Sequence, residues 1–210
     1  MKKRIYNLII LDESGSMWSI AKQAVDGVNE SIQTIRAAQR KNEDQEHFVT
    51  LVTFNDEVRT LFDCVSAEGV EDLKAEEYDP NCCTALYDAM GISLNALKTK
   101  VKKEDKVLVT IVTDGCENAS KEYNGAAIKL LVDNLKAQGW VFAYLGANHD
   151  VEKMAANISI TNVMQFEASM EGTSTMMHTL SRARSRLYEN MGSKHFCSEE
   201  ANNSFFEENF

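Results

Sequence analysis

The sequence predicts a doubly wound α/β fold, in which a mostly parallel sheet carries helices on both of its faces. Short apolar segments rich in β-branched residues alternate along the chain with amphipathic segments of helical length. Two of the apolar segments, 4–11 and 106–113, have the continuous hydrophobicity of central parallel strands, which are buried on both faces. A third segment, 58–65, alternates in polarity after the tight polar turn at 55–57. We therefore expect one antiparallel edge strand beside an otherwise parallel sheet.

The elements of this fold are expected in a regular order. The strand at 4–11 leads into a long helix over 17–40, because the apolar residues there recur at near-helical spacing. Gly139 is expected to end a later helix, since glycine readily adopts the left-handed conformation of a C-cap. The complete prediction is strand 4–11, helix 17–40, strands 47–54 and 58–65, helix 84–101, strand 106–113, helix 121–138, strand 140–146, short helix 150–157, weak strand 162–166 and helix 171–191.

The chain is expected to form one domain. Its 210 residues suit a single large domain, and it contains one proline, Pro80, and no Gly/Ser-rich or charged low-complexity segment that would indicate a linker. We assign residues 1–191 to this domain. Residues 192–210 form an acidic and aromatic C-terminal tail that we expect to pack on the same domain. The alternative is self-association through the tail, with Glu207 or Glu208 supplying a ligand to another copy.

The composition argues against several classes of partner and location. Lys and Arg number 22 against 32 Asp and Glu, and the net charge of −10 disfavours nucleic acid or an anionic membrane, because phosphate binding needs basic surface. No segment approaches the roughly 20 apolar residues of a membrane-spanning helix. The five cysteines show no disulfide-framework spacing, which suits a reducing compartment. We therefore expect a cytoplasmic protein.

The first apolar run ends in a group of oxygen-bearing side chains. Asp12, Ser14 and Ser16 form the pattern D-x-S-x-S directly after the strand at 4–11. In a tight loop, oxygens on alternate residues can converge on one hard cation, and Mg²⁺ prefers near-octahedral oxygen ligands. A helix N-cap is the alternative interpretation, because Ser and Asp accept hydrogen bonds from the free N–H groups of a first turn.

Two further residues complete the predicted ligand set. Asp114 ends the strand at 106–113, and Thr84 opens the predicted helix at 84–101. Ligand sites of open parallel sheets form beyond the carboxyl ends of the strands, at the point where the winding direction switches. Two carboxylates would balance the charge of a divalent cation there, and the N-cap interpretation does not account for Thr84 and Asp114. The predicted metal ligands are Asp12, Ser14, Ser16, Thr84 and Asp114.

These segments resemble one known family. D-x-S-x-S, then the threonine of T-A-L-Y-D-A, then T-D-G at 113–115 are similar to the metal-ion-dependent adhesion site of von Willebrand factor A domains. The resemblance covers roughly residues 4 to 190. The strings at 113–120 and 145–148 look like those of the bacterial and phage stand-alone members.

The resemblance implies a fold, a cofactor and a partner. It implies a Rossmann-like sheet and a bound Mg²⁺ or Mn²⁺. In this family, water or an acidic side chain from a partner fills the remaining coordination position. We therefore expect a protein-interaction module that grips a Glu or Asp of a partner protein and that is not an enzyme.

Two other functions stay open, a metal-dependent phosphoesterase and a purely structural metal site. A haloacid-dehalogenase-like phosphatase needs a second carboxylate where this chain has Ser14. The chain also lacks a G-x-x-x-x-G-K-[ST] phosphate loop and a G-x-S-x-G elbow. Metal-assisted hydrolysis needs a general base, and the nearby candidates are Glu13 and Glu117, which we interpret as rim residues.

Three cysteines adjoin the predicted ligands. Cys82 and Cys83 immediately precede Thr84, and Cys116 follows Asp114 closely. Their position is consistent with redox gating of the site or with binding of a softer metal such as Zn²⁺. The simpler interpretation is that small side chains fit a crowded loop.

Three arginines of the last predicted helix are expected to face solvent. Arg182, Arg184 and Arg186 are spaced two residues apart, so they point in different directions around a helix. This spacing favours a solvated surface over an anion-binding site.

Overall fold

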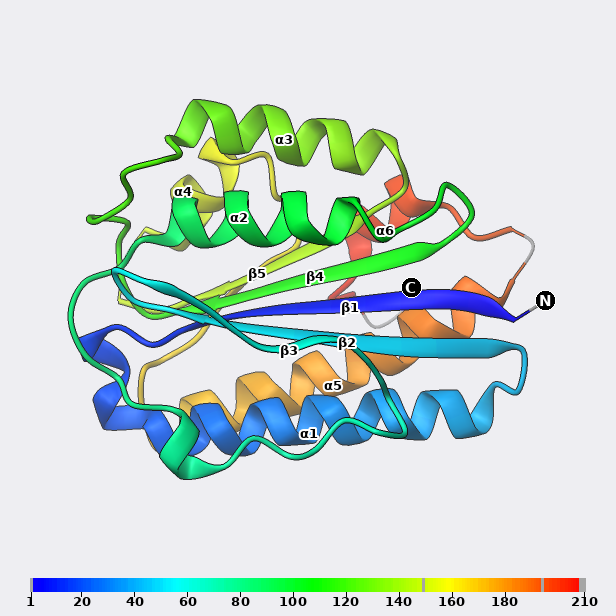
Figure 1. The fold of residues 1–210 in the computed structure, drawn as a ribbon, viewed down its shortest axis with the longest axis horizontal. Coiled ribbons are helices and arrows are strands. Elements are labelled where there is room, and N and C mark those ends of the chain that lie inside the picture. The colour runs from blue at the N-terminus through cyan, green and yellow to red at the C-terminus, as the bar shows by residue number, and fades with distance from the viewer. Residues whose placement is uncertain (1, 149, 194, 208–210) are drawn as a thin grey trace.

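A six-stranded sheet runs through the middle of the molecule in the computed structural model, which describes residues 2–148, 150–193 and 195–207 (Figure 1). The strands are β1 (Lys3–Asp12), β2 (Gln45–Phe54), β3 (Val58–Ser66), β4 (Lys106–Thr113), β5 (Val141–Gly146) and β6 (Val163–Gln165). Their order across the sheet is β3-β2-β1-β4-β5-β6. Only β3 pairs antiparallel, with β2 at one edge, and the other neighbours are parallel. The predicted fold class is confirmed.

Helices cover both faces of this sheet. They are α1 (Ala21–Lys41), α2 (Leu86–Lys98), α3 (Gly125–Ala137), α4 (Val151–Asn157), α5 (Met170–Gly192) and α6 (Ser198–Ser204), with 3₁₀ turns η1 (Gly15–Ile20) and η2 (Ala75–Glu77). α1 and α5 lie side by side on one face, and α2, α3 and α4 cover the other (Figure 1). Side chains of β1 alternate between the two cores, since Ile9 packs on the α1–α5 side and Ile10 on the other.

The order of strands places a switch point between β1 and β4. From β1 the chain winds outward to β2 and β3, and from β4 it winds the other way to β5 and β6. In the register of the central pair, Leu11 lies beside Val112. The loops that follow Asp12 and Thr113 therefore leave the sheet at the same edge, where open α/β sheets bind ligands.

The start of α2 differs from the prediction for a tertiary reason. The helix begins at Leu86 rather than at 84, and the N–H groups of its first turn are bonded by side chains from a distant loop. Tyr87 N–H donates to Glu117 at 2.9 Å, and Asp88 N–H donates to Ser120 at 3.0 Å. These caps replace the local ones that sequence patterns can indicate.

The same contacts delay the start of α3. The carboxylate of Asp88 accepts the N–H groups of Lys121, Glu122 and Tyr123 at 2.7 to 2.9 Å. This segment therefore forms a loop around the carboxylate instead of the first turn predicted at 121. The helix itself begins at Gly125.

The C-terminal tail contains a helix that the sequence pattern did not predict. α6 packs against β5, and Phe205 just after it is fully buried. Asn202 bonds to the backbone at the start of β5, accepting from Phe142 N–H at 3.0 Å and donating to the Trp140 carbonyl at 2.8 Å. The carbonyl of Glu207 accepts from Arg186, while Glu208 lies outside the described residues.

Arg184 does not face solvent, and the prediction for this residue is wrong. Its side chain is fully buried beneath the sheet, where it donates to Thr110 Oγ1 at 2.9 Å and to the Tyr188 hydroxyl at 3.5 Å. Tyr188 in turn donates to Asn7 at 2.5 Å. The spacing of the three arginines could not reveal this, because burial of one helix face depends on how α5 docks.

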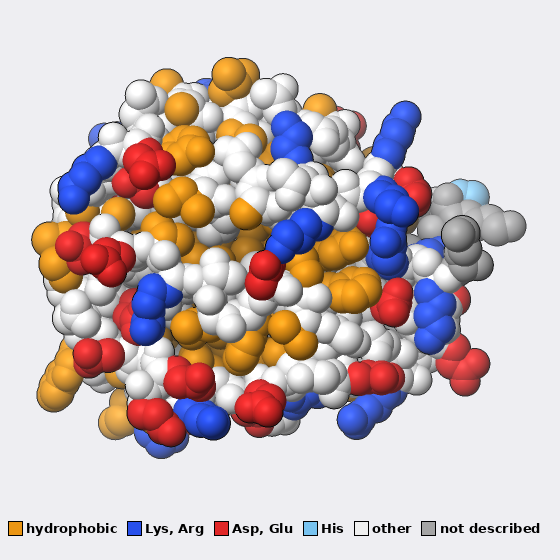
Figure 2. Space-filling view, viewed as in Figure 1, with side chains coloured by type: hydrophobic (Ala, Val, Ile, Leu, Met, Phe, Trp, Pro, Cys, Tyr) orange, Lys and Arg blue, Asp and Glu red, His pale blue; other side chains and the backbone are white. Residues whose placement is uncertain are grey.

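The surface carries charges of both signs. Figure 2 shows several Lys and Arg side chains toward the edge where the strands begin, with Asp and Glu scattered over the rest of this face. Within the described part of the chain, no helix combines the length and apolarity needed to cross a bilayer.

Candidate metal centre

Asp12 lies at the carboxyl end of β1 and is held in one orientation. Its side chain is fully buried. Oδ1 accepts the N–H of Ser14 at 2.7 Å, and Oδ2 accepts the hydroxyl of Thr113 at 2.5 Å. The backbone carbonyl of Asp12 accepts the hydroxyl of Tyr78, also at 2.5 Å. The loop after β1 and the last residue of β4 thus hold this carboxylate.

The hydroxyls of the D-x-S-x-S loop reach toward the loop after β4. Ser16 donates to Asp114 Oδ1 at 2.5 Å, and the hydroxyl oxygens of Ser14 and Ser16 are 3.2 Å apart. Asp114 and Ser14 are each 2 % exposed, whereas Ser16 is open to solvent. Four of the five predicted ligands are therefore linked. Asp12 accepts from Ser14, Ser14 contacts Ser16, and Ser16 donates to Asp114.

The surroundings of Gly115 place Thr84 next to the other predicted metal ligands. A Cβ built on Gly115 would lie 3.1 Å from Thr84 Oγ1, 3.6 Å from Ser16 Oγ and 3.9 Å from Asp12 Oδ2. Oxygens from the D-x-S-x-S loop and from Thr84 therefore surround one point in the loop after β4 that a methyl group would occupy. We call this volume, with the oxygens of Asp12, Ser16 and Thr84 around it, the cradle. The Ser14–Ser16 and Ser16–Asp114 contacts bring the other two predicted ligands to the same place.

The electrostatics of the cradle favour a cation. The pKa of Asp12 is raised to about 6, mainly because the carboxyl is buried and in smaller part because Asp114 is close. A raised pKa means that the ionised form is costly in this place. A divalent cation would offset that cost, and carboxylate and hydroxyl oxygens are the ligands that a hard cation prefers.

The donor set differs from that of a softer metal. Among the residues that the structure describes, no three His, Cys, Asp or Glu side chains are arranged to hold an ion. The cradle combines two carboxylates with three hydroxyls instead. This set fits Mg²⁺ or Mn²⁺ better than a thiolate- or imidazole-binding metal.

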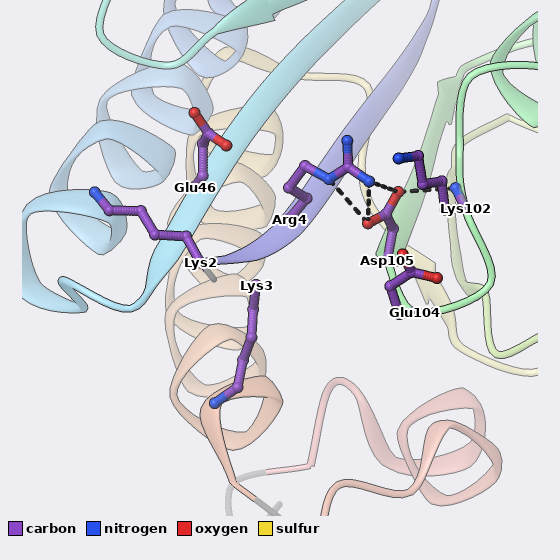
Figure 3. A pocket seen from close by; sticks show the side chains of 7 residues that line it. All are labelled: Lys2, Lys3, Arg4, Glu46, Lys102, Glu104 and Asp105. Atoms are coloured by element: carbon purple, nitrogen blue, oxygen red, sulfur yellow. Dashed lines mark hydrogen bonds and ion pairs between the residues drawn. The ribbon is translucent and has the colours of Figure 1, made fainter.

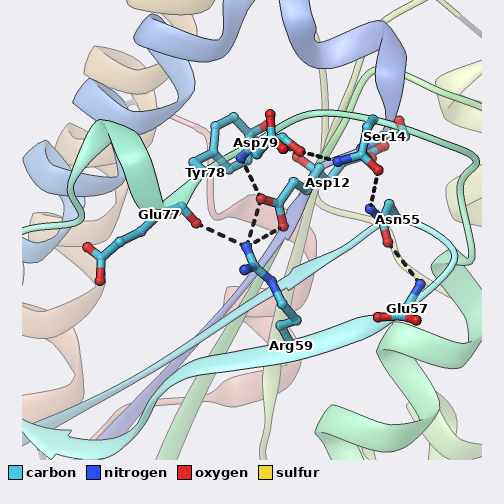
Figure 4. Close-up of polar contacts among 10 residues, drawn as sticks. Asp12, Ser14, Asn55, Glu57, Arg59, Glu77, Tyr78 and Asp79 are labelled. Carbon is cyan, nitrogen blue, oxygen red and sulfur yellow. Dashed lines mark hydrogen bonds and ion pairs between the residues drawn. The ribbon is translucent and has the colours of Figure 1, made fainter.

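Glu13 supports the site rather than lining its rim. It is 3 % exposed, and both of its oxygens accept from Arg59 at 2.8 and 2.9 Å. Arg59 also donates to the Glu77 carbonyl, and Asp79 N–H donates to Glu13 at 2.7 Å (Figure 4). This ion pair ties the loop after β1 to β3 and to the segment around η2. The interpretation of Glu13 as a rim residue is therefore wrong.

The carboxylate of Glu117 is also held by hydrogen bonds. Its two oxygens accept from the N–H groups of Tyr87, Ala119 and Ser120 and from the Ser120 hydroxyl, at 2.7 to 3.0 Å. A carboxylate that accepts four hydrogen bonds holds the loop after β4 against the start of α2. Both candidate bases are therefore engaged by hydrogen bonds within the protein.

Two supporting residues, Asn118 and Arg59, could not be found from the sequence. Asn118 Oδ1 accepts the N–H of Thr84 at 2.9 Å, and its own N–H donates to the Thr84 carbonyl at 3.0 Å. These contacts position Thr84 across a separation of 34 residues. No local pattern around either residue indicates a partner so distant in the chain.

Several cavities lie outside the cradle among the described residues, and two of them differ in position relative to it. One of about 360 Å³ adjoins it and is lined by Glu13, Asn55, Asp56, Glu57, Arg59, Asp79 and Asn81. Another of about 570 Å³ lies at the opposite edge of the sheet, where Arg4 donates to both oxygens of Asp105 at 3.0 and 3.1 Å (Figure 3). The second cavity shares no residue with the predicted ligands.

A known family of domains matches just over half of the chain. The model of the von Willebrand factor type A domain matches residues 8–117, which include all five predicted ligands. No curated protein matches the sequence.

Solved structures with the same fold share little sequence with this chain. Proximal thread matrix protein 1 from the mussel byssus superposes with a TM-score of 0.65 at 17% identity, covering 88% of this chain and 47% of that one. A von Willebrand factor type A protein from Catenulispora acidiphila gives 0.61 at 14% identity, with 86% and 42% covered. This chain therefore spans less than half the length of these two neighbours.

One structural neighbour was solved with a metal ion in its metal-ion-dependent adhesion site (MIDAS). It is the mussel byssus protein with a zinc-occupied MIDAS motif, with a TM-score of 0.58, 16% identity and coverage of 88% and 46%. The SpRpn10 VWA domain, by contrast, is a neighbour of similar size, with a TM-score of 0.58, 13% identity and coverage of 85% and 95%.

Proposed function

The chain belongs to the von Willebrand factor type A domain family, and on this basis we propose that it is a metal-dependent protein-interaction module. Asp12 and Asp114 supply the negative charge for a divalent cation, and Ser14, Ser16 and Thr84 supply neutral oxygens. The bound cation, Mg²⁺ or Mn²⁺, offers an open coordination position to a Glu or Asp of a partner protein.

The convergence around Gly115 carries this proposal. Two segments far apart in sequence, D-x-S-x-S and the one that carries Thr84, place oxygens within 3.1 to 3.9 Å of one small volume in the loop after β4, and the carboxylates of Asp12 and Asp114 are buried there. A helix cap would account for single serines, but it would not require Asp12, whose ionisation is costly, to lie near a second carboxylate, Asp114. A cation accounts for both observations, because it relieves the repulsion and uses the oxygens.

We propose that this module binds a partner protein and does not catalyse a reaction. The two candidate bases are Glu13, which accepts from Arg59, and Glu117, which accepts from backbone amides. Metal-assisted hydrolysis would need one of them to accept a proton from water. Binding needs no such group, because a partner carboxylate completes the coordination by itself.

Zinc is the alternative cation to consider, because the mussel byssus protein was solved with zinc in its MIDAS motif. Zinc prefers nitrogen and sulfur ligands in closed tetrahedral sites, whereas this cradle offers only oxygen. Among the described residues, the hard-cation donor set therefore supports Mg²⁺ or Mn²⁺ over Zn²⁺.

The test begins with the metal alone. Isothermal titration of the full chain with Mg²⁺, Mn²⁺ and Zn²⁺ is expected to show one site for Mg²⁺ or Mn²⁺, lost in Asp12→Ala and Asp114→Ala. Asp44→Ala is the matched control, because Asp44 is an exposed carboxylate paired with Lys3 at the opposite edge of the sheet. Unchanged binding in the two site variants would refute the assignment.

A second step tests the interaction. Proteins retained from a native lysate are compared with Mg²⁺, with EDTA, and on the two site variants. A partner retained only with metal and only by wild type and Asp44→Ala supports the proposal, once an acidic-to-amide substitution in that partner abolishes binding. Metal binding that raises the melting temperature without any metal-dependent partner would favour the structural-metal alternative.

A further inference from the structure

Two adjacent thiols lie on the segment that delivers Thr84 to the metal centre. Cys82 and Cys83 are both exposed to solvent. Cys82 has a φ of 63°, in the left-handed region that residues other than glycine seldom adopt. The side chains of Asp56 and, with a smaller effect, Cys83 are close enough to the Cys82 thiol to raise its pKa. The two sulfur atoms are therefore neighbours that a reagent in solution can reach.

The backbone on each side of this pair is tied to a different loop of the site. The carbonyl of Cys82 accepts the N–H of Gly15, in the middle of D-x-S-x-S, at 3.2 Å. On the other side, Thr84 exchanges hydrogen bonds with Asn118 in the loop after β4. The peptide bond between Cys82 and Cys83 therefore connects the two loops that carry the carboxylates.

We propose that Cys82 and Cys83 form a reversible oxidation site, in which a low-molecular-weight disulfide of the glutathione class joins the two sulfurs and thereby loosens the metal centre. The coupling to the metal depends on the function proposed above, whereas formation of the disulfide does not.

The chemistry balances without any other oxidant. One cysteine thiolate attacks glutathione disulfide, breaks its S–S bond and releases one glutathione, leaving a mixed disulfide. The neighbouring cysteine then attacks the protein sulfur of that mixed disulfide and releases the second glutathione. Two electrons pass from the protein thiols to the reagent, and the two thiol protons end on the two glutathione molecules.

The geometry makes the bond easy to reverse. Adjacent Cα atoms are about 3.8 Å apart across a trans peptide, which is shorter than the roughly 4.4–6.8 Å of ordinary disulfides. The resulting small ring is therefore strained, and strained, exposed disulfides have more oxidising potentials and are the labile ones. This pair would respond to the ratio of glutathione disulfide to glutathione instead of forming a permanent cross-link.

The ring would act directly on the metal loops. It contains the peptide bond whose carbonyl accepts from Gly15, so closing it would change the backbone dihedral angles that aim this carbonyl at the D-x-S-x-S loop. Gly15 lies between the ligands Ser14 and Ser16, and Thr84 directly follows the ring. Oxidation would therefore disturb ligands on both sides of the cradle.

The other cysteines provide internal controls. Cys64 is half-buried in β3, within 3.5 Å of Thr50 Oγ1. Cys197 is exposed and directly follows Phe196, whose ring packs on Lys106 at the start of β4, the edge opposite the metal centre. Cys116 is exposed in the loop after β4 and is the one competing thiol near the site.

Peptide mapping tests the chemistry. The reduced full chain is equilibrated in glutathione buffers of increasing oxidation, remaining thiols are alkylated, and the protein is digested with trypsin. Cys82 and Cys83 share the tryptic peptide 75–98, whereas Cys116 falls in 107–121. We expect the first peptide to lose two hydrogens and to escape alkylation, and to recover both thiols after dithiothreitol.

Mg²⁺ titration of the reduced and oxidised forms tests the coupling. We expect the dissociation constant to rise about tenfold on oxidation, the effect of losing one hydrogen bond that orders the ligand loop. Cys83→Ser should abolish this response, and Cys197→Ser should retain it.

Three results would overturn the proposal. They are glutathione adducts on both thiols without a bond between them, a cross-link from Cys116 to either cysteine, or a Cys82–Cys83 disulfide that leaves the Mg²⁺ dissociation constant unchanged. A reduced protein that binds no Mg²⁺ would instead refute the proposed function and the coupling with it, while the peptide map still decides whether the disulfide forms.

Discussion

The hydroxyl of Ser16 donates to Asp114 across 2.5 Å, although the two residues are 98 positions apart in the chain. The contact exists because β1 and β4 are neighbours in the sheet and end at the same edge. It joins the loop of D-x-S-x-S to the loop after β4, and the predicted coordination of a cation depends on this junction.

Metal binding should stabilise the protein by mass action. At a Mg²⁺ concentration of 100 times the dissociation constant, the gain is about 2.7 kcal/mol. For a domain of this size, that corresponds to a rise of about 5–10 °C in the melting temperature. Differential scanning fluorimetry with Mg²⁺ and with EDTA measures the difference. Asp114→Asn should remove it, while Asp44→Asn should not.

Gly115→Ala should damage the site while the domain stays folded. The new methyl group would approach Thr84 Oγ1 to 3.1 Å and fill the volume that the oxygens surround. We expect Mg²⁺ affinity to fall at least about tenfold and the free energy of unfolding without metal to change by less than about 1 kcal/mol. Titration calorimetry and urea unfolding measure the two quantities. Gly69→Ala is the control, because its Cβ would meet the Ser66 carbonyl at an ordinary 3.8 Å.

Stability should fall in mild acid because of His47. Burial, with a smaller contribution from Arg184, lowers the pKa of His47 to about 4, against 6.5 for an ordinary histidine. Between these values the unfolded chain binds a proton that the folded chain does not, so stability is complete above about pH 6.5 and declines toward pH 4. The loss from this group is roughly 3 kcal/mol.

A pair of variants isolates this effect. The contribution of Asp12 to stability changes with pH in the opposite direction. Its pKa is raised to about 6, so its contribution to stability is lost as the pH rises. Urea unfolding at pH 7.5 and 5 should show a smaller decline for His47→Gln than for wild type. His178→Gln should match wild type, since that imidazole is 72% exposed. Equal declines in all three proteins would contradict the assignment to His47.

The C-terminal tail should contribute to stability. Asn202→Ala leaves the N–H of Phe142 and the carbonyl of Trp140 without their buried partner, which should cost about 2–4 kcal/mol. Asn203→Ala is the adjacent control, because Asn203 is exposed and bonds only locally to the Glu199 carbonyl. Chemical denaturation of both variants checks this. A cost below about 1 kcal/mol for Asn202→Ala would show that the tail is dispensable.

Self-association through the tail can be tested separately. Ending the chain after Met191 removes α6 together with Glu207 and Glu208. Sedimentation velocity of the full chain and the shortened chain with Mg²⁺ would show whether any oligomer depends on these residues. An oligomer that persists after truncation would contradict the tail as its cause.

The sequence by itself determined the class of fold and the identity of the predicted ligands. Short apolar runs rich in β-branched residues favour strands buried on both faces, and the strand at 106–113 has the same bounds in the structure. The five ligand residues were predictable because four of them lie at or just beyond the ends of β1 and β4 and Thr84 lies shortly before α2, so their places in the chain assign them to one edge of a parallel sheet. Gly139 likewise adopts the positive φ of 92° that its place after α3 requires.

Only the tertiary structure decided what supports those residues. Glu117, Asn118 and Arg59 act on partners from 30 to 46 positions away, and such pairings follow from how loops pack. The buried Arg184 and the helix α6 have the same origin, because one depends on the docking of α5 and the other on backbone groups that β5 leaves open. Periodicity reports which side of an element is apolar, whereas the partner of a polar side chain is set by the assembled fold.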